Sequence, residues 1–333
     1  MFLNGGAIPP FGSFPLADFE GVIFHEFGHY SGLAHTVVNG QNVGLGDTSG
    51  PTPFNTYGDS PADQVETMYP FALIGGGQVT PHADDIGFLS FLYPSAGYFA
   101  NSGTISGVIL DPTSTTPLTG VNVIARNVAD PFVDAVSAIS GDRGTTGVYS
   151  INGLTPGADY TVHIDQILQG GFSTEPLQIG APEEFYNGAA ESNNITWPDD
   201  PADSVTIATS AGVPNEGIDV ILNAPAPGDP LPVGDDGSYQ LFLPFEFRLC
   251  GQPFDSVFVN ANGNLTFGAS SSDFTESISE HLTGPPRIAG LWDDLNPSQG
   301  GIVTYGVDRR SFSVIYEDVP EFFATGSNSF TIT

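Results

Sequence analysis

The residues best suited to do chemistry lie together in one short stretch, HEFGHYSGLAH, at positions 25–35 of the 333-residue chain. It holds His25, His29 and His35, which are half of the six histidines. On a helix, residues four apart project from one face, so His25 and His29 can reach the same metal ion. Gly32 can take the left-handed conformation that ends a helix, and the chain can then bring His35 back as a third ligand.

Three neutral imidazoles leave one tetrahedral position for water, which is the arrangement of catalytic zinc sites. Zinc lowers the pKa of such a water toward about 7 and polarises a scissile carbonyl group. Glu26 is offset from His25 by about 100° around a helix, so it can reach that water rather than the metal. The pattern therefore predicts a Zn²⁺ hydrolase with Glu26 as general base. The alternative is that these histidines are satisfied within a core.

The stretch resembles the extended HExxHxxGxxH signature of the metzincin zinc endopeptidases. That resemblance implies one catalytic Zn²⁺, a polypeptide substrate and a methionine turn beneath the metal. Met68, Tyr69 and Pro70, followed by DDIGFLSFLYP, resemble the matrixin branch of these enzymes. In that branch the acids that match Asp84 and Asp85 brace the floor of the active site. The alternative is that both are favourable charges at a helix N-terminus.

The resemblance covers roughly residues 15–98, and it departs from the family in two ways. The stretch from His35 to Met68 is longer than in compact matrixins, and only 24 residues precede His25. The family places a twisted sheet before the zinc helix. We therefore expect residues 1–98 to be the C-terminal half of a catalytic domain. Weak or absent peptidase activity is expected of this chain by itself.

Two helices are expected to position these residues. Asp18 is a candidate N-cap, and apolar residues follow it at helical spacing: Phe19, Val22, Ile23, Phe27 and Tyr30. A second helix is predicted at about 82–93, with acidic residues in its first turn. His82, before these acids, is expected to be a surface or capping residue rather than a fourth ligand.

The rest of the chain predicts two mostly β modules. Residues 103–223 contain short strands between turn signals, typical of a β-sandwich. Segments such as GTISGVIL and YSINGLTPGADYTV resemble the carboxypeptidase regulatory-like, transthyretin-like domain. A Pro-rich linker follows at 224–232. Residues 233–333, with LPFEFRLCGQPFDSVFVNANGNLTFG, resemble a nidogen-like module that is truncated at its C-terminus. The predicted fold class is multidomain: an α+β partial metzincin domain followed by two sandwich-like β modules.

Composition limits the partners. A net charge of −32 without any lysine disfavours nucleic acid and anionic membranes as partners. No apolar run is long enough to span a membrane, and the first residues lack the pattern of a signal peptide. We expect a secreted or cell-surface protein whose signal lies outside this chain. Asp293 and Asp294 are candidates for Ca²⁺, with a solvated turn as the alternative.

The sequence thus predicts an exported zinc metalloendopeptidase whose trailing β modules bind extracellular protein or carbohydrate. The alternative is a non-catalytic surface adhesin or extracellular matrix-type binding protein with a degenerate metzincin region. Glu26 favours the enzyme, because decay of the site would be expected to reach the general base as readily as the ligands.

Overall fold

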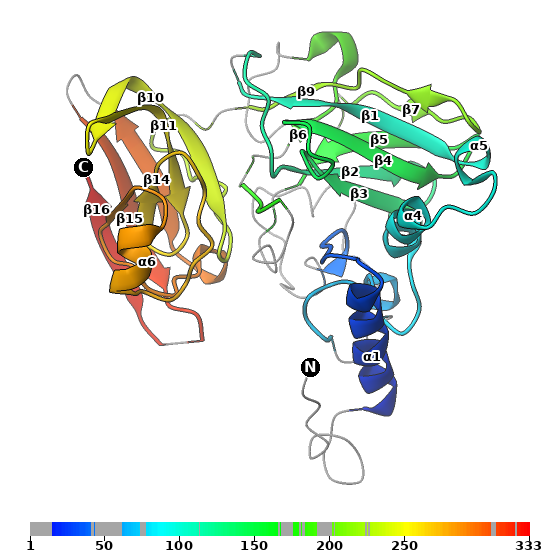
Figure 1. Ribbon diagram of the computed structural model, residues 1–333, viewed down its shortest axis with the longest axis horizontal. Helices are drawn as coiled ribbons and strands as arrows, with labels where there is room; N and C mark the ends of the chain where they lie inside the picture. Colours follow the sequence, from blue (N-terminus) through cyan, green and yellow to red (C-terminus); the bar gives the residue numbers. More distant parts are fainter. Residues whose placement is uncertain are drawn as a thin grey trace.

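The computed structural model describes residues 15–40, 43, 62–73, 78–112, 114–165, 167, 176–179, 181, 184–191, 202, 204–223, 225, 227–307, 311–323 and 325–333. The fold is mostly β, with several sheets and few helices. Figure 1 shows two lobes: one holds the N-terminal helices and strands β1–β9, and the other holds β10–β16. No helix in the described part of the chain is both long and apolar enough to cross a membrane.

The predicted first helix is α1, Leu16–Tyr30, and it ends at the histidine cluster. The prediction of Asp18 as N-cap is wrong, because the helix begins two residues earlier and Pro15 is the N-cap. Asp18 lies in the first turn instead, where the helix dipole favours a negative charge. One face of α1 is apolar and exposed to solvent: Phe27 is 62% and Tyr30 is 89% exposed.

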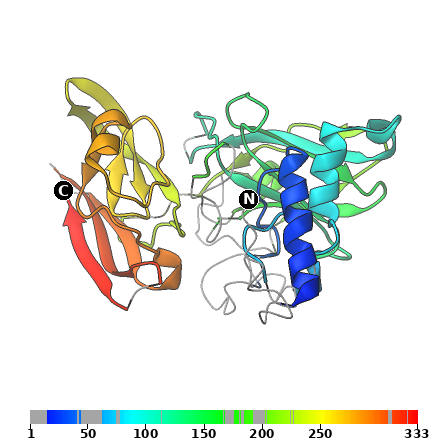
Figure 2. The same ribbon diagram turned by 60° about the horizontal axis from the view of Figure 1, so that its bottom comes forward.

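The second helix, α4, spans Ala83–Leu92, and His82 is its N-cap. A short 3-10 helix, η2, spans Ala62–Gln64, and the one-turn helix α5 spans Tyr98–Asn101. Figure 2 shows α1 and α4 in the same lobe, and the C-terminal ends of the two helices meet where the Tyr93 hydroxyl donates to Ser31 O at 3.1 Å. Gly87 lets α4 approach the sandwich closely, because a Cβ there would lie 3.1 Å from the Asn152 carbonyl oxygen.

Residues 103–223 form a sandwich of two sheets. The first sheet has the order β4-β1-β8, with β9 also paired to β1, and the second has the order β3-β2-β5-β6, with β7 paired to β5. Their bounds are β1 Gly103–Leu110, β2 Asn122–Asn127, β3 Ala135–Ile139, β4 Val148–Leu154, β5 Asp159–Ile164, β6 Glu184–Phe185, β7 Ile207–Ala208, β8 Pro214–Asn215 and β9 Val220–Ile221. A 3-10 helix, η4, spans Gly188–Ala190. Every second residue of β1 is buried, as expected for a strand with one face on a core.

The C-terminal lobe also contains two sheets, with the orders β10-β11-β12-β13 and β14-β15-β16. Their bounds are β10 Ser238–Leu249, β11 Gln252–Asn260, β12 Asn264–Thr266, β13 Arg287–Ala289, β14 Ile302–Val307, β15 Phe312–Pro320 and β16 Ser327–Ile332. Helix α6 spans Ile278–Thr283, and the 3-10 helix η6 spans Pro297–Gln299. Side chains from both sheets, including Val257 and Tyr316, share one core. Part of the predicted linker runs along β14, where Gly228 N–H donates to the Tyr305 carbonyl at 2.8 Å.

The sandwich is joined to the N-terminal segment by a buried arginine. Arg126 on β2 donates to Val38 O at 2.6 Å and to Asn39 Oδ1 at 2.8 Å. It also donates to the Pro131 carbonyl at 2.8 Å. Val38 packs beside Ile124 of the same sheet. The segment that follows His35 is therefore held by the sandwich.

Replacing Arg126 with alanine should destabilise the protein by about 2–4 kcal/mol, because two buried acceptors and one half-buried acceptor would lose their donor. Urea unfolding followed by circular dichroism measures the change. Arg248→Ala is the matched control: Arg248 pairs with Glu246 at the surface, and its loss should cost about 0–0.5 kcal/mol. Equal losses in the two variants would contradict the bridging role of Arg126.

Candidate metal centre

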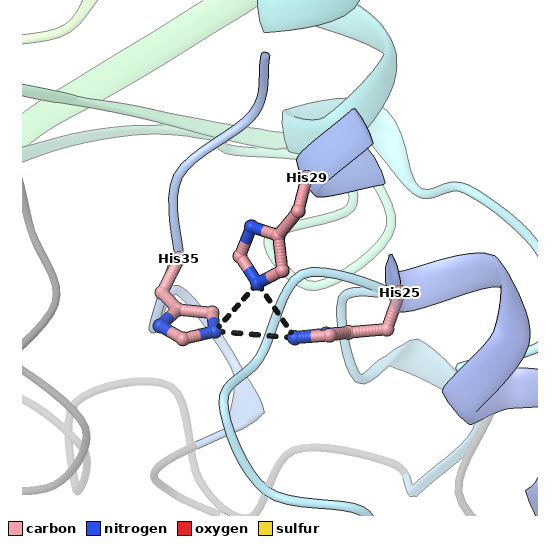
Figure 3. A group of neighbouring side chains, drawn as sticks. All are labelled: His25, His29 and His35. Carbon is pink, nitrogen blue, oxygen red and sulfur yellow. Dashed lines mark hydrogen bonds between the residues drawn. The ribbon is translucent and has the colours of Figure 1, made fainter. Parts of the chain in front are cut away.

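The three predicted ligands converge on one point. The Nε2 atoms of His25 and His29 are 3.1 Å apart, those of His25 and His35 are 3.1 Å apart, and those of His29 and His35 are 3.0 Å apart. Figure 3 shows His25 and His29 projecting from α1 toward His35 on the chain that follows. Two nitrogens on one tetrahedral zinc at 2.0–2.1 Å are about 3.3–3.4 Å apart. The observed triangle is close to that size.

Hydrogen bonds to carbonyl groups fix which nitrogen carries the proton in two of the rings. His25 Nδ1 lies 2.8 Å from Thr67 O, and His29 Nδ1 lies 2.9 Å from Leu33 O. A carbonyl oxygen only accepts, so each Nδ1 must be the donor. In a neutral ring the Nε2 is then a bare lone pair. Two lone pairs that face each other at 3.1 Å repel, whereas a cation placed between them is attracted to both.

The surroundings keep two of these rings neutral. Burial, and then repulsion from His25 and His29, lowers the pKa of His35 to about 4. Burial also lowers the pKa of His25, against the opposing hydrogen bond to Thr67. A metal ion competes with protons for imidazole nitrogen, so neutral rings are ready to bind.

The end of α1 places both His29 and His35. Gly32 has a φ of +92°, as predicted, and its N–H donates to His29 O at 3.0 Å. Leu33 N–H donates to Gly28 O at 3.0 Å, which completes a Schellman turn. The same turn presents the Leu33 carbonyl to His29 Nδ1. One glycine-dependent turn thus reverses the chain toward His35 and orients a second ligand.

Asp85 organises the turn that contains Met68. Its carboxylate accepts hydrogen bonds from Thr67 N–H and Met68 N–H, both at 3.0 Å, and from His82 N–H at 2.8 Å. Burial raises the pKa of Asp85, while these three donors favour the ionised form. The same turn also places the Thr67 carbonyl oxygen so that it accepts a hydrogen bond from His25 Nδ1. Asp85 therefore supports a ligand through the backbone.

Met68 packs directly against the helix that carries the histidines. It is 2% exposed, and a Cβ on Gly28 would lie 2.1 Å from its Sδ. Gly28, inside the motif, was not singled out by the sequence analysis. Glycine within a helical pattern costs about 1 kcal/mol relative to alanine, so it signals a close approach.

The next turn residues, Tyr69 and Pro70, have different environments. Tyr69 is fully buried, and its ring lies against Gly40, where a Cβ would be 2.3 Å away. Pro70 is half-buried and borders the same hollow as His25 and Glu26 of α1. Glu66, which precedes the turn, accepts from the N–H groups of Asn39 and Gly40.

Glu26 lies where water and substrate could reach it. An open hollow is bordered by His25, Glu26, Tyr69, Pro70 and neighbouring residues, among them Ala72 and Gln78. Gln78 holds this border by donating to Phe71 O at 3.0 Å and accepting from Leu73 N–H at 2.9 Å. Residues 74–77, between Leu73 and Gln78, lie outside the described residues.

Asp84 has a different role from Asp85. Its Oδ1 accepts from the N–H of Ser137 on β3 and, at 3.0 Å, from the Ser137 hydroxyl. Burial raises the pKa of Asp84 to about 6, although hydrogen bonds from Thr36 and Ser137 favour the carboxylate. Asp84 thus ties α4 to the sandwich, and both acids do more than provide charge at a helix N-terminus.

A second cluster lies in the C-terminal lobe. Asp235, Asp236 and Asp294 each offer a carboxylate oxygen within 4.8 Å of the others. Asp294 belongs to the pair predicted as calcium candidates, whereas Asp293 lies outside the cluster and accepts from Asp294 N–H at 2.9 Å. The sequence analysis missed Asp235 and Asp236, although the Asp-Asp-Gly tripeptide is a turn signal.

Gly28→Ala should destabilise the protein by about 1–3 kcal/mol, because the new methyl group collides with Met68. Without that collision the substitution would stabilise the helix by about 1 kcal/mol. In a Met68→Ala background the penalty should therefore vanish or change sign. Urea unfolding of both single variants and the double variant measures this coupling. Additive free energies would show that the two residues do not press on each other.

Comparison with known proteins identifies the C-terminal part of the chain. Residues 226–332 match the family model described as NIDO related, which supports a nidogen-like domain there. A search of curated proteins found no match. Among solved structures, the chain is similar to the dioxygenase domain of a dioxygenase carbohydrate-binding protein fusion from the cellulolytic bacterium Streptomyces sp. SirexAA-E. That likeness has 17% identity and a TM-score of 0.21, and it covers 39% of this chain and 85% of that one. The family match covers the C-terminal module and leaves out the histidine cluster.

Proposed function

We propose that this chain carries the zinc-binding and general-base residues of an exported, matrixin-like metalloendopeptidase. The observation that carries the proposal is the convergence of three Nε2 atoms, two of which have their tautomer fixed by carbonyl groups. Hydrogen bonding among neutral imidazoles does not account for this geometry, since both Nδ1 atoms of His25 and His29 face carbonyl groups and neither Nε2 then carries a proton. Three nitrogen ligands and an adjacent carboxylate favour catalytic zinc.

The chain's own residues supply the other parts of peptide hydrolysis. Zinc contributes Lewis acidity, which acidifies water and polarises a peptide carbonyl. Glu26 takes a proton from the attacking water and delivers it to the leaving amine. Thr67 O and Leu33 O hold the ligand rings in place. Met68 fills the space under the helix, so His25 and His29 keep one orientation.

The proposal extends to the rest of the chain. Residues 15–98 carry the zinc-ligand part of a metzincin catalytic domain, and the sandwich is a carboxypeptidase regulatory-like module. The nidogen-like module binds extracellular protein or carbohydrate, which suits a secreted or cell-surface enzyme.

The alternative, a non-catalytic adhesin or matrix protein, shares the β modules and differs at the metal centre. A degenerate site would bind zinc loosely and would not depend on Glu26. The following two measurements therefore distinguish these functions.

The purified chain should contain about one zinc ion, and His25→Ala, His29→Ala and His35→Ala should each lose most of it. Inductively coupled plasma mass spectrometry measures the stoichiometry after dialysis. His281→Ala is the matched control, because His281 lies on α6 in the other lobe, and it should keep its zinc. Stoichiometric zinc in the His35→Ala variant would show that the third ligand is misassigned.

The Glu26→Gln variant should keep its zinc. Its rate of cleavage of unfolded casein should be at least about 100-fold lower than any rate of the wild type, because the general base is removed. Acetohydroxamate binding gives a second readout that needs no turnover. Calorimetry should show affinity about 10-fold weaker in the variant, because the carboxylate no longer accepts a proton of the ligand. Unchanged cleavage or unchanged hydroxamate affinity would contradict the role of Glu26. Robust casein cleavage by the wild-type chain would overturn the expectation of weak activity.

A further inference from the structure

The acidic cluster of the C-terminal lobe joins two loops that are far apart in the sequence. Asp235 and Asp236 lie in the turn before β10, which is closed by a hydrogen bond of 3.1 Å from Gly237 N–H to Gly234 O. Asp294 lies on the loop between β13 and β14. The cluster is therefore placed where one bound ion would connect the edges of the two sheets.

The geometry suits a large, oxygen-binding cation. Two oxygens on one Ca²⁺ at about 2.4 Å can be at most about 4.8 Å apart. The three carboxylate oxygens lie within that limit of one another. The cluster contains no histidine or cysteine, so an all-oxygen site favours calcium over zinc or copper.

A buried oxygen without a partner is the second, independent observation. Asp235 is 3% exposed, and its Oδ1 has no hydrogen-bond partner among the described residues. Burying a carboxylate oxygen without a donor or a cation is costly. Because Asp235 contributes an oxygen to the cluster, its carboxylate points toward the other two acids.

A neighbouring amide fixes the other two acids relative to each other. Asn262 Nδ2 donates to Asp236 Oδ1 at 2.7 Å, and Asn262 Oδ1 accepts from Leu295 N–H at 2.9 Å, next to Asp294. Asn262 itself is buried. The acids are thus held in place before any ion arrives, which reduces the ordering that binding would require.

The local charges make the cluster favourable for a cation. Burial, followed by repulsion from Asp236 and Asp294, raises the pKa of Asp235 to about 8. The two basic side chains described in this lobe are engaged elsewhere. Arg248 pairs with Glu246 at 2.7 Å, and Arg287 lies 3.7 Å over the Trp292 ring. Arg309 and Arg310 lie outside the described residues.

We propose that Asp235, Asp236 and Asp294 form a calcium site that locks the turn before β10 to the loop before β14. The ion supplies the positive charge that the described residues around the cluster lack, and it satisfies the buried oxygen of Asp235. Calcium thereby becomes part of the folded C-terminal module, independently of the histidine centre.

The test uses the full chain, stripped of calcium, in 0.15 M salt. Calorimetry should show about one Ca²⁺ per chain. At ten times the dissociation constant, calcium should raise the midpoint of the module's thermal unfolding by roughly 5–10 °C. Mg²⁺ should bind at least about 10-fold more weakly, because it demands a compact octahedral site. An equal response to Mg²⁺ would overturn the assignment to calcium.

The Asp235→Asn variant distinguishes two explanations of the cluster, a calcium site and a group of acids that share protons. Asparagine keeps the shape and replaces a buried carboxyl group that is costly to ionise beside two other acids, so without calcium the variant should melt above the wild type. With calcium the order should reverse, because the variant binds the ion at least about 10-fold more weakly. Asp294→Asn, at a less buried position, should behave in the same way. If the melting temperatures of these variants stay above that of the wild type in saturating calcium, the proposal is overturned.

Asp255→Asn is the matched control, because Asp255 is an exposed acid on β11 in the same lobe. It removes the same charge and should leave both the calcium affinity and the shift in melting temperature unchanged. An equal loss of affinity in this control would attribute calcium binding to the overall negative charge, and it too would overturn the proposal.

Discussion

The geometry of the candidate metal centre depends on the buried carboxyl group of Asp85. Its two oxygens accept three backbone N–H groups, so they fix the start of α4 and the turn around Met68 in one step. In this turn the Thr67 carbonyl accepts a hydrogen bond from His25, and the Met68 thioether packs against Gly28. Hydrogen bonds to a buried charge are strong because the surroundings screen them little. Asp85, which lies outside the histidine cluster, therefore sets the orientation of His25 through the backbone of the turn.

The sandwich participates in the same architecture. The chain that leaves His35 passes directly to Val38 and Asn39, whose oxygen atoms bind Arg126. Thr36 N–H donates to Met68 O at 3.1 Å, which ties this segment to the methionine turn. The segment that carries His35, the third predicted ligand, is thus held between the turn on one side and strand β2 on the other. The sandwich therefore supports the candidate metal centre as well as forming a separate module.

Local patterns in the sequence predicted much of this arrangement. Helical spacing and the glycine after it gave α1, its turn and the approach of His35, since all three depend on neighbouring residues. Alternation predicted β1 as it is observed. The match at residues 226–332 bears out the nidogen-like identification, and the matrixin-like assignment remains a prediction.

What the sequence did not reveal depends on contacts between distant residues. The pairing of Arg126 with Asn39 spans 87 positions, and no periodicity encodes it. Strand β3 has only five residues, and buried and half-buried positions do not alternate strictly along it. Its sequence therefore carries no clear strand pattern. The helix boundary at Pro15 was missed because Asp18 matches a capping preference that the fold does not use. Asp235 and Asp294 meet only once both sheets have formed.

The scarcity of basic residues has a consequence for how the molecules meet one another. Four arginines lie in the described part of the chain, and each is engaged within it: Arg126 with buried carbonyls, Arg143 over Phe91, Arg248 with Glu246 and Arg287 over Trp292. With a net charge of −32, two copies therefore approach as polyanions with few cationic patches to pair. Their mutual repulsion is long-ranged in dilute buffer and shrinks to about 8 Å at physiological salt. The ionic strength of the medium thus decides how closely the apolar face of α1 can approach other surfaces.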